Sequence, residues 1–198
     1  VSIQLEIREK DLEQAHLCLG TRGYEHTHPD RHASYILNAV LGGSMSSRLF
    51  QKIREKRGLA YAVSSGLISY RDVGSLTVYA GCDGGAVPQV IDLVVDEMKT
   101  LKQHPLADSE LQRAKDHLRG SFVLGQESTT SRMSQLARSE MYFGRQIDVA
   151  ETLKAIDLVS QEDVQRVACD LFQGRALAGT VVGPVTTADL HAFQLDLS

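Results

Sequence analysis

The sequence predicts an α+β fold, a two-layer sandwich in which helices cover one face of a mostly antiparallel sheet. Three observations predict it. A short strand-like run lies near the start, two alternating runs between residues 59 and 83 form a hairpin pattern, and "ALAGTVVGP" is a further strand-like run. The long segments between these runs have the 3.6-residue apolar period of amphipathic helices.

The first elements divide the chain. Residues 1–13 are rich in charge and predict a linker or N-terminal extension, and residues 14–198 predict a single domain. "QAHLCLG", residues 14–20, predicts a strand. Asp30 is the expected cap of a helix that ends at Gly42 and Gly43. Its apolar residues follow the helical period: Ala33, Ile36, Leu37, Val40 and Leu41.

A second helix is expected from Ser46 to Arg57, ending at Gly58. We expect this helix to bury Leu49, Phe50 and Ile53 and to expose Arg48, Lys52 and Glu55.

The runs "LAYAVSSGLISY" and "SLTVYAGCD", joined by "RDVG", predict an antiparallel hairpin. In the first strand Leu59, Tyr61 and Val63 should share one face. In the second strand one face should be covered and the other, with Thr77 and Tyr79, more open. The expected covered residues are Leu76, Val78, Ala80 and Cys82.

The helical period returns several times after the hairpin. It is carried first by Val87, Val90, Ile91, Val94, Met98 and Leu101, then by Leu111, Ala114 and Leu118, and later by Met133, Leu136 and Ala137. Ser160 and Asp163 have the spacing of a capping box before a last helix.

Composition narrows the classes of protein. Hydrophobic residues make up 42% of the chain, charged residues 23%, and the net charge is −4, which describes a soluble globular protein without a nucleic-acid footprint. No apolar run reaches the roughly 20 residues that span a membrane. Cys18, Cys82 and Cys169 are odd in number and far apart, so we expect buried free thiols in a reducing compartment such as the cytoplasm.

The segment "HTHPDRH" brings His26, His28 and His32 together in the sequence, and three histidines can in principle share a metal ion. A solvated loop and helix start explains them more simply, and a self-sufficient metal-binding module is the weaker alternative. Neither H-E-x-x-H nor H-x-x-E-H occurs. The chain alone is therefore expected to supply no metal ligand and no catalytic residue.

Arg54 and Tyr61 are the candidate substrate-binding residues. Arg54 lies at the margin of the expected buried stripe, and a reversal at Gly58 would bring the Tyr61 hydroxyl towards it. Together they would offer several hydrogen-bond donors, which suit a carbonyl oxygen or a carboxylate. The alternative is an Arg that caps its helix and a Tyr that fills the hairpin face.

"LGGSMSSRLFQKIREKRGLAYAV", residues 41–63, resembles the hallmark of the C-terminal domain of the pitrilysin/insulinase family of zinc peptidases, in its mitochondrial-processing-peptidase-like branch. The similarity extends over most of the chain, through "HPDRHASYILNAVLGG", "SELQRAKDHLRGSFVLGQEST", "DLVSQEDVQRVACDLF" and "GTVVGP".

The resemblance implies a tandem arrangement around a peptide-binding chamber. Zinc is expected in a separate N-terminal domain of the same polypeptide or in a partner subunit, and this chain would complete the chamber and be inactive alone. Arg54 and Tyr61 match the Arg and Tyr that reach the substrate backbone in this family. The alternative is a non-catalytic scaffold or substrate-presenting subunit of the same architecture, which a degenerate zinc motif in the upstream half would favour.

Overall fold

The computed structural model describes residues 4–174, 177–186 and 197. The strands are β1 (Gln4–Glu9), β2 (Ala15–Gly23), β3 (Ala60–Ser69), β4 (Gly74–Cys82) and β5 (Ala178–Gly183). The helices are α1 (Arg31–Leu41), α2 (Val87–Gln103), α3 (Asp108–Gly125), α4 (Thr129–Phe143), α5 (Val149–Leu158) and α6 (Gln161–Leu171). A π-helix, η1, covers Phe50–Glu55, and a 3₁₀ turn, η2, covers Gly84–Ala86.

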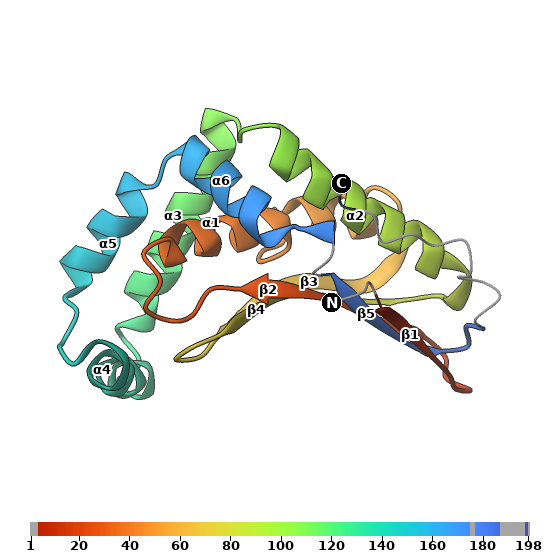
Figure 1. Cartoon of the computed structure of the whole chain (residues 1–198), viewed down its shortest axis with the longest axis horizontal. Coiled ribbons are helices and arrows are strands. Elements are labelled where there is room, and N and C mark those ends of the chain that lie inside the picture. Colours follow the sequence, from red (N-terminus) through yellow and green to blue (C-terminus); the bar gives the residue numbers. More distant parts are fainter. Residues whose placement is uncertain (1–3, 175–176, 187–196, 198) are drawn as a thin grey trace.

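The two-layer α+β prediction is confirmed. The sheet has the strand order β1-β5-β2-β4-β3, with β1 parallel to β5 and every other neighbouring pair antiparallel. Helices lie over one face of the sheet, and α4 lies lower than the others, beside the end of the β3–β4 hairpin (Figure 1). In the described part of the chain, no helix is both long and apolar enough to span a membrane.

Residues 4–9 correct the prediction of a linker over residues 1–13. They form β1, an edge strand that pairs with β5 from Gln4 opposite Ala178 to Glu9 opposite Gly183. Leu5 and Ile7 pack against the core, while Glu6 between them and Arg8 after them are charged. The segment was difficult to recognise because two apolar residues make a weak pattern and its hydrogen-bond partner is about 170 residues away in the chain.

The hydrophobic core lies between the sheet and the helices. The predicted hairpin is confirmed, and the predicted covered face of β4 is fully buried at Leu76, Val78, Ala80 and Cys82. Its neighbour β2 contributes Ala15, Leu17 and Leu19 to the same face. Alternation along both strands therefore leaves the opposite face of the sheet free of helices.

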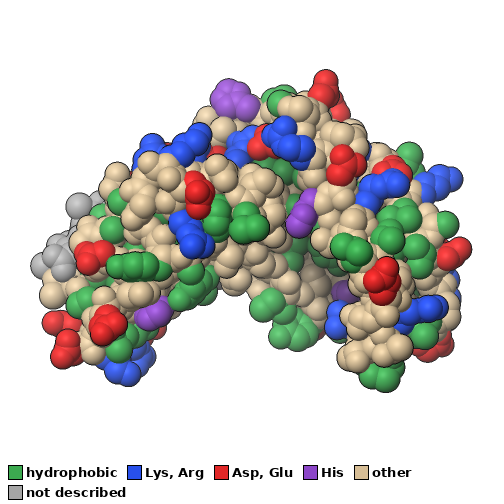
Figure 2. Space-filling model, turned by 180° about the vertical axis from the view of Figure 1, so that it is seen from behind, with side chains coloured by type: hydrophobic (Ala, Val, Ile, Leu, Met, Phe, Trp, Pro, Cys, Tyr) green, Lys and Arg blue, Asp and Glu red, His purple; other side chains and the backbone are tan. Residues whose placement is uncertain are grey.

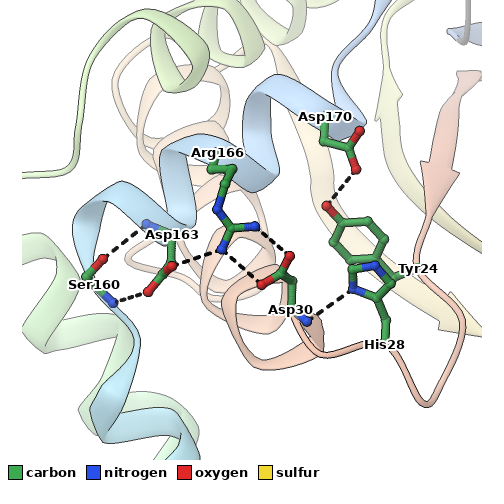
Figure 3. A network of polar contacts seen from close by, with 7 residues as sticks. All are labelled: Tyr24, His28, Asp30, Ser160, Asp163, Arg166 and Asp170. Atoms are coloured by element: carbon green, nitrogen blue, oxygen red, sulfur yellow. Dashed lines mark hydrogen bonds and ion pairs between the residues drawn. The ribbon is translucent and has the colours of Figure 1, made fainter.

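The expected helix α1 is confirmed, but Asp30 does not cap it with its side chain. The Asp30 carboxylate instead accepts two hydrogen bonds from Arg166 of α6, at 2.6 and 3.0 Å (Figure 3). These bonds hold the pKa of Asp30 below its usual value. Arg166 also binds Asp163, whose capping box with Ser160 is present as predicted. The bidentate pair with a helix distant in sequence replaces the local cap.

Two predictions of burial are wrong. Met133 and Leu136 of α4 are exposed, because α4 does not lie on the sheet. Cys18 and Cys169 are also exposed free thiols, and Cys82 alone among the three cysteines is buried. Cys18 alternates with Leu17 and Leu19, which places it on the open face of β2.

Candidate functional site

The segment from Met45 to Val63 contains a helix of a different type from the α-helix that the sequence predicted. The backbone N–H of Lys56 donates to the carbonyl of Gln51, five residues back, so the expected α-helix is a π-helix over Phe50–Glu55. Leu49 and Ile53 are fully buried as predicted, whereas Phe50 is only partly buried. The wider turn changes which side chains face the core.

Arg48 is not the solvent-facing cation that the sequence predicted, and Lys52, whose side chain is 44% exposed, also pairs with a buried carboxylate. The Arg48 side chain is 19% exposed and makes a bidentate pair with Glu110 of α3, at 2.8 and 2.7 Å. Glu97 of α2 is 1% exposed and accepts ion pairs from both Arg48 and Lys52. The two cations therefore neutralise a buried carboxylate that needs a charged partner.

Arg54 is exposed on the other side of the same segment. Its guanidinium lies over the Phe50 ring, with Cζ 5.1 Å from the ring centroid. In the described part of the chain Arg54 makes no side-chain hydrogen bond and no ion pair. Its hydrogen-bond donors are therefore available to a ligand.

Tyr61 is aimed outwards by a β-bulge. Ala60 pairs with Cys82 and Ala62 with Gly81, so Tyr61 has no partner on β4. The bulge turns Ala60 and Val63 inwards and leaves the Tyr61 side chain 67% exposed. The prediction that Leu59, Tyr61 and Val63 share one face is therefore wrong. No hydrogen bond joins Arg54 and Tyr61 among the described residues.

Two glycines bring the π-helix and β3 into place. Gly58 adopts φ +62°, in the left-handed region, and its N–H donates to the Arg54 carbonyl at 3.0 Å. At Gly42 a Cβ would lie 2.6 Å from the backbone nitrogen of Ser65, and that nitrogen donates to the Gly42 carbonyl at 3.0 Å. The turn after α1 is thus fastened directly to β3, which fixes the strand that carries Tyr61.

The open face of the sheet carries Tyr79, which the sequence predicted there, and also His16, which it did not single out. His16 Nδ1 lies 2.9 Å from the Tyr79 hydroxyl, and their rings stack at 6.1 Å. Gly81 pairs with His16 on one side and Ala62 on the other, and the Tyr79 hydroxyl lies over it. The alternation of "AHLCLG" could have placed His16 on this face, but only the register brings it beside Tyr79.

The face opposite the helices is hollowed. Figure 2 shows an arched molecule with hydrophobic side chains projecting into the hollow, and Figure 1 shows that the open side of the sheet lies above it. β3 forms one edge of the sheet, and its outer edge has no partner strand among the described residues. An extended peptide entering the hollow would meet both the polar side chains of the open face, His16 and Tyr79, and the outer edge of β3.

The three histidines considered as metal ligands turn to different neighbours. The His28 ring stacks on Tyr24 with centroids 3.8 Å apart, and the His26 ring lies against Tyr142 at 4.3 Å. Burial lowers the pKa of His32 to about 4. Within the ranges that the structure describes, no group of three or more His, Cys, Asp or Glu side chains is placed to hold a metal ion.

Comparison with known proteins identifies relatives at the level of sequence. The family model described as "Peptidase M16 inactive domain" matches residues 2–118. A Streptomyces coelicolor protein named "Uncharacterized zinc protease SCO5738" is 42% identical over 182 residues, which are 92% of this chain and 39% of the relative. "Uncharacterized zinc protease YmxG" from Bacillus subtilis is 41% identical over 165 residues, covering 83% and 40%. The chain therefore spans about two fifths of the length of these relatives.

Solved structures show the same fold. A peptidase M16 inactive domain from Pseudomonas fluorescens superposes with a TM-score of 0.84 at 24% identity, over 93% of this chain and 44% of that one. A conserved protein from Enterococcus faecalis V583 gives a TM-score of 0.82 at 24% identity, over 91% and 42%. With the sequence matches, these findings confirm the family resemblance: the chain belongs to the peptidase M16 family and is its inactive C-terminal domain.

Proposed function

We propose that this chain completes the peptide-binding chamber of a two-domain zinc metalloendopeptidase and contacts the substrate backbone through Arg54 and Tyr61. Its relatives carry the name zinc protease and are a little over twice as long. The described residues provide no cluster of metal ligands, so the zinc belongs in this proposal to an N-terminal domain of the same polypeptide or to a partner subunit.

The observation that carries the proposal is the outward aim of Arg54 and Tyr61. Arg54 and Tyr61 are seven residues apart, one on a π-helix and the other at a β-bulge, and both side chains are exposed. Such irregularities occur often at functional sites. The guanidinium and the hydroxyl can donate to a substrate carbonyl oxygen and stabilise the negative charge that develops on it during hydrolysis.

The rest of the open face supports binding of an extended peptide. The outer edge of β3 has no partner strand among the described residues, and apart from the Ser65 N–H, which donates to the Gly42 carbonyl, a peptide can add along it as a further strand. Tyr61 is the bulged residue of that same edge strand, so a peptide paired with β3 would pass beside it. Main-chain pairing would supply affinity without demanding a particular substrate sequence.

The test is to replace Arg54 by Ala and, separately, Tyr61 by Phe in the complete zinc-loaded protein. Each change should lower kcat/KM on a peptide substrate by about 100-fold, as loss of one oxyanion donor does, and leave the zinc content unchanged. Arg71→Ala and Tyr70→Phe are matched controls, because both side chains are exposed at the hairpin turn. Variants of Arg54 and Tyr61 as active as these controls would remove both residues from the proposed role.

The size of the native polypeptide tests the other part of the proposal. An antibody against residues 45–63 should detect a band at about twice the 21.7 kDa of this chain, in keeping with domains in tandem. A band at the mass of the chain itself, with no zinc-bearing partner isolated alongside it, would contradict the chamber and favour a scaffold.

A further inference from the structure

A second concave site lies away from Arg54 and Tyr61, between α1, the end of α3 and α4. It is a cavity of about 510 Å³, and a smaller one of about 370 Å³ adjoins it towards the end of β3. Both cavities are lined by His26, Tyr35 and Arg138. The larger volume is within the range of small-molecule sites, roughly 300 to 1,000 Å³.

Two cations line the larger cavity without a carboxylate partner. Arg138 of α4 makes no side-chain hydrogen bond and no ion pair with any described residue. Among the described residues, the Arg31 side chain of α1 donates only to the His28 carbonyl, at 3.3 Å, and its Cζ lies 5.0 Å from the centroid of the Phe143 ring. Both guanidinium groups help to lower the pKa of His26, after burial, which places them near the same ring.

A carboxylate near Arg31 is already paired with another arginine. Glu151 of α5 is close enough for Arg31 and His32 to influence its pKa, which its hydrogen bond to Arg145 lowers most. Arg145 Nη1 donates to Glu151 Oε2 at 2.9 Å. Because this carboxylate is already paired, the cavity keeps an excess of positive charge that favours an anion.

The remaining wall combines neutral polar and apolar groups. His32 Nδ1 is buried and has no hydrogen-bond partner among the described residues. The low pKa of His32, about 4, keeps its ring neutral at pH 7, so it can exchange a hydrogen bond with a ligand without adding charge. Phe122, Phe143 and Ile147 supply an apolar side to the same cavity.

We propose that this cavity binds a small organic acid, with its carboxylate between Arg31 and Arg138 and its apolar body against Phe122 and Phe143. Guanidinium groups bind carboxylates through paired, directional hydrogen bonds. The acid is either free in solution or the C-terminal residue of a peptide, because both present the same carboxylate on an apolar body. This assignment does not depend on the proposed peptidase activity.

Titration calorimetry with N-acetyl-phenylalanine as probe tests the assignment, with N-acetyl-phenylalanine amide as its uncharged match. The acid should bind the protein and the amide should bind at least 10-fold more weakly. Arg138→Gln should weaken binding of the acid by about 10-fold or more. Arg132→Gln, on the same helix but outside the cavity, should change it less than twofold. Thermal unfolding of both variants checks that they are folded. Arg31→Gln tests the other arginine of the cavity in the same way.

Equal binding of the acid and the amide would overturn the proposal, as would equal affinity of the Arg138 and Arg132 variants. Inorganic phosphate that bound as tightly as the acid would also overturn it, because the apolar body would then contribute nothing. A hexapeptide ending in a free Phe carboxylate distinguishes the two sources. If the hexapeptide binds and its C-terminally amidated form does not, the natural ligand is a peptide terminus. If N-acetyl-phenylalanine binds and the hexapeptide does not, the natural ligand is a free acid.

Discussion

Arg48 and Arg54 stand six residues apart on one short segment and do opposite things. Arg48 is turned into the molecule, where it pairs with Glu110 and with the buried Glu97. Arg54 is exposed, and its guanidinium lies over the Phe50 ring without an ion pair to any described residue. The difference teaches that the local pattern of charge does not tell a structural cation from an available one. The partner residue decides which kind a cation is, and Glu97 lies about 50 residues beyond Arg48 in the chain.

Replacing Arg48 should have the largest effect on the stability of the fold. Arg48→Ala should lower the free energy of unfolding by about 3 kcal/mol or more, because it leaves Glu97 buried with only Lys52 as partner. Urea unfolding measures the change. The control is Arg57→Ala on the same segment, whose side chain is exposed and should cost less than about 1 kcal/mol. Equal losses in both variants would show that the Glu97 pair does not stabilise the fold.

The second prediction concerns His32, whose buried Nδ1 has no hydrogen-bond partner among the described residues. The pKa of His32 is lowered to about 4 by burial, with Arg31 adding to the shift and Glu151 opposing it. Between the ordinary value near 6.5 and about 4, the unfolded state binds more protons, so His32 makes stability fall as pH falls through this window. From pH 7 to pH 5 the loss should be about 1 to 2 kcal/mol, allowing for partial solvation.

Urea unfolding at pH 7 and pH 5 checks this dependence. His32→Gln should remove that part of the loss, while His104→Gln, at an exposed helix end, should follow the unchanged protein. A wild-type protein and a His32 variant with parallel pH profiles would show that the ring gains a proton as readily in the folded as in the unfolded state.

Replacing Arg54 should have the smallest effect on stability. Arg54→Ala should cost only about 0.5 to 1 kcal/mol, the size of an exposed cation–π contact with Phe50. Urea unfolding of Arg54→Ala and Arg48→Ala under the same conditions compares the two losses of unfolding free energy. If Arg54→Ala destabilised as much as Arg48→Ala, Arg54 would be a structural residue, and a loss of turnover in the variant could not be assigned to substrate contact.

Much of the fold could be predicted because it depends on local periodicity. The helical stripe ending at Gly42, the hairpin through "RDVG" and the Ser160–Asp163 capping box are confirmed within a few residues. The family hallmark over residues 41–63 also pointed to Arg54 and Tyr61 before any geometry was known. Both side chains lie exposed on the surface, and their role in substrate binding stays a prediction.

The sequence by itself determined the class of fold, the positions of most elements and the family, since these depend on spacing along the chain. Tertiary structure alone decided the pairing of β1 with β5, the burial of Arg48 against Glu97, and the cavity around Arg138. It also converted an expected α-helix into a π-helix and placed the bulge at Tyr61. Each of these depends on a partner strand or helix distant in sequence, and burial against that partner outweighs local propensity.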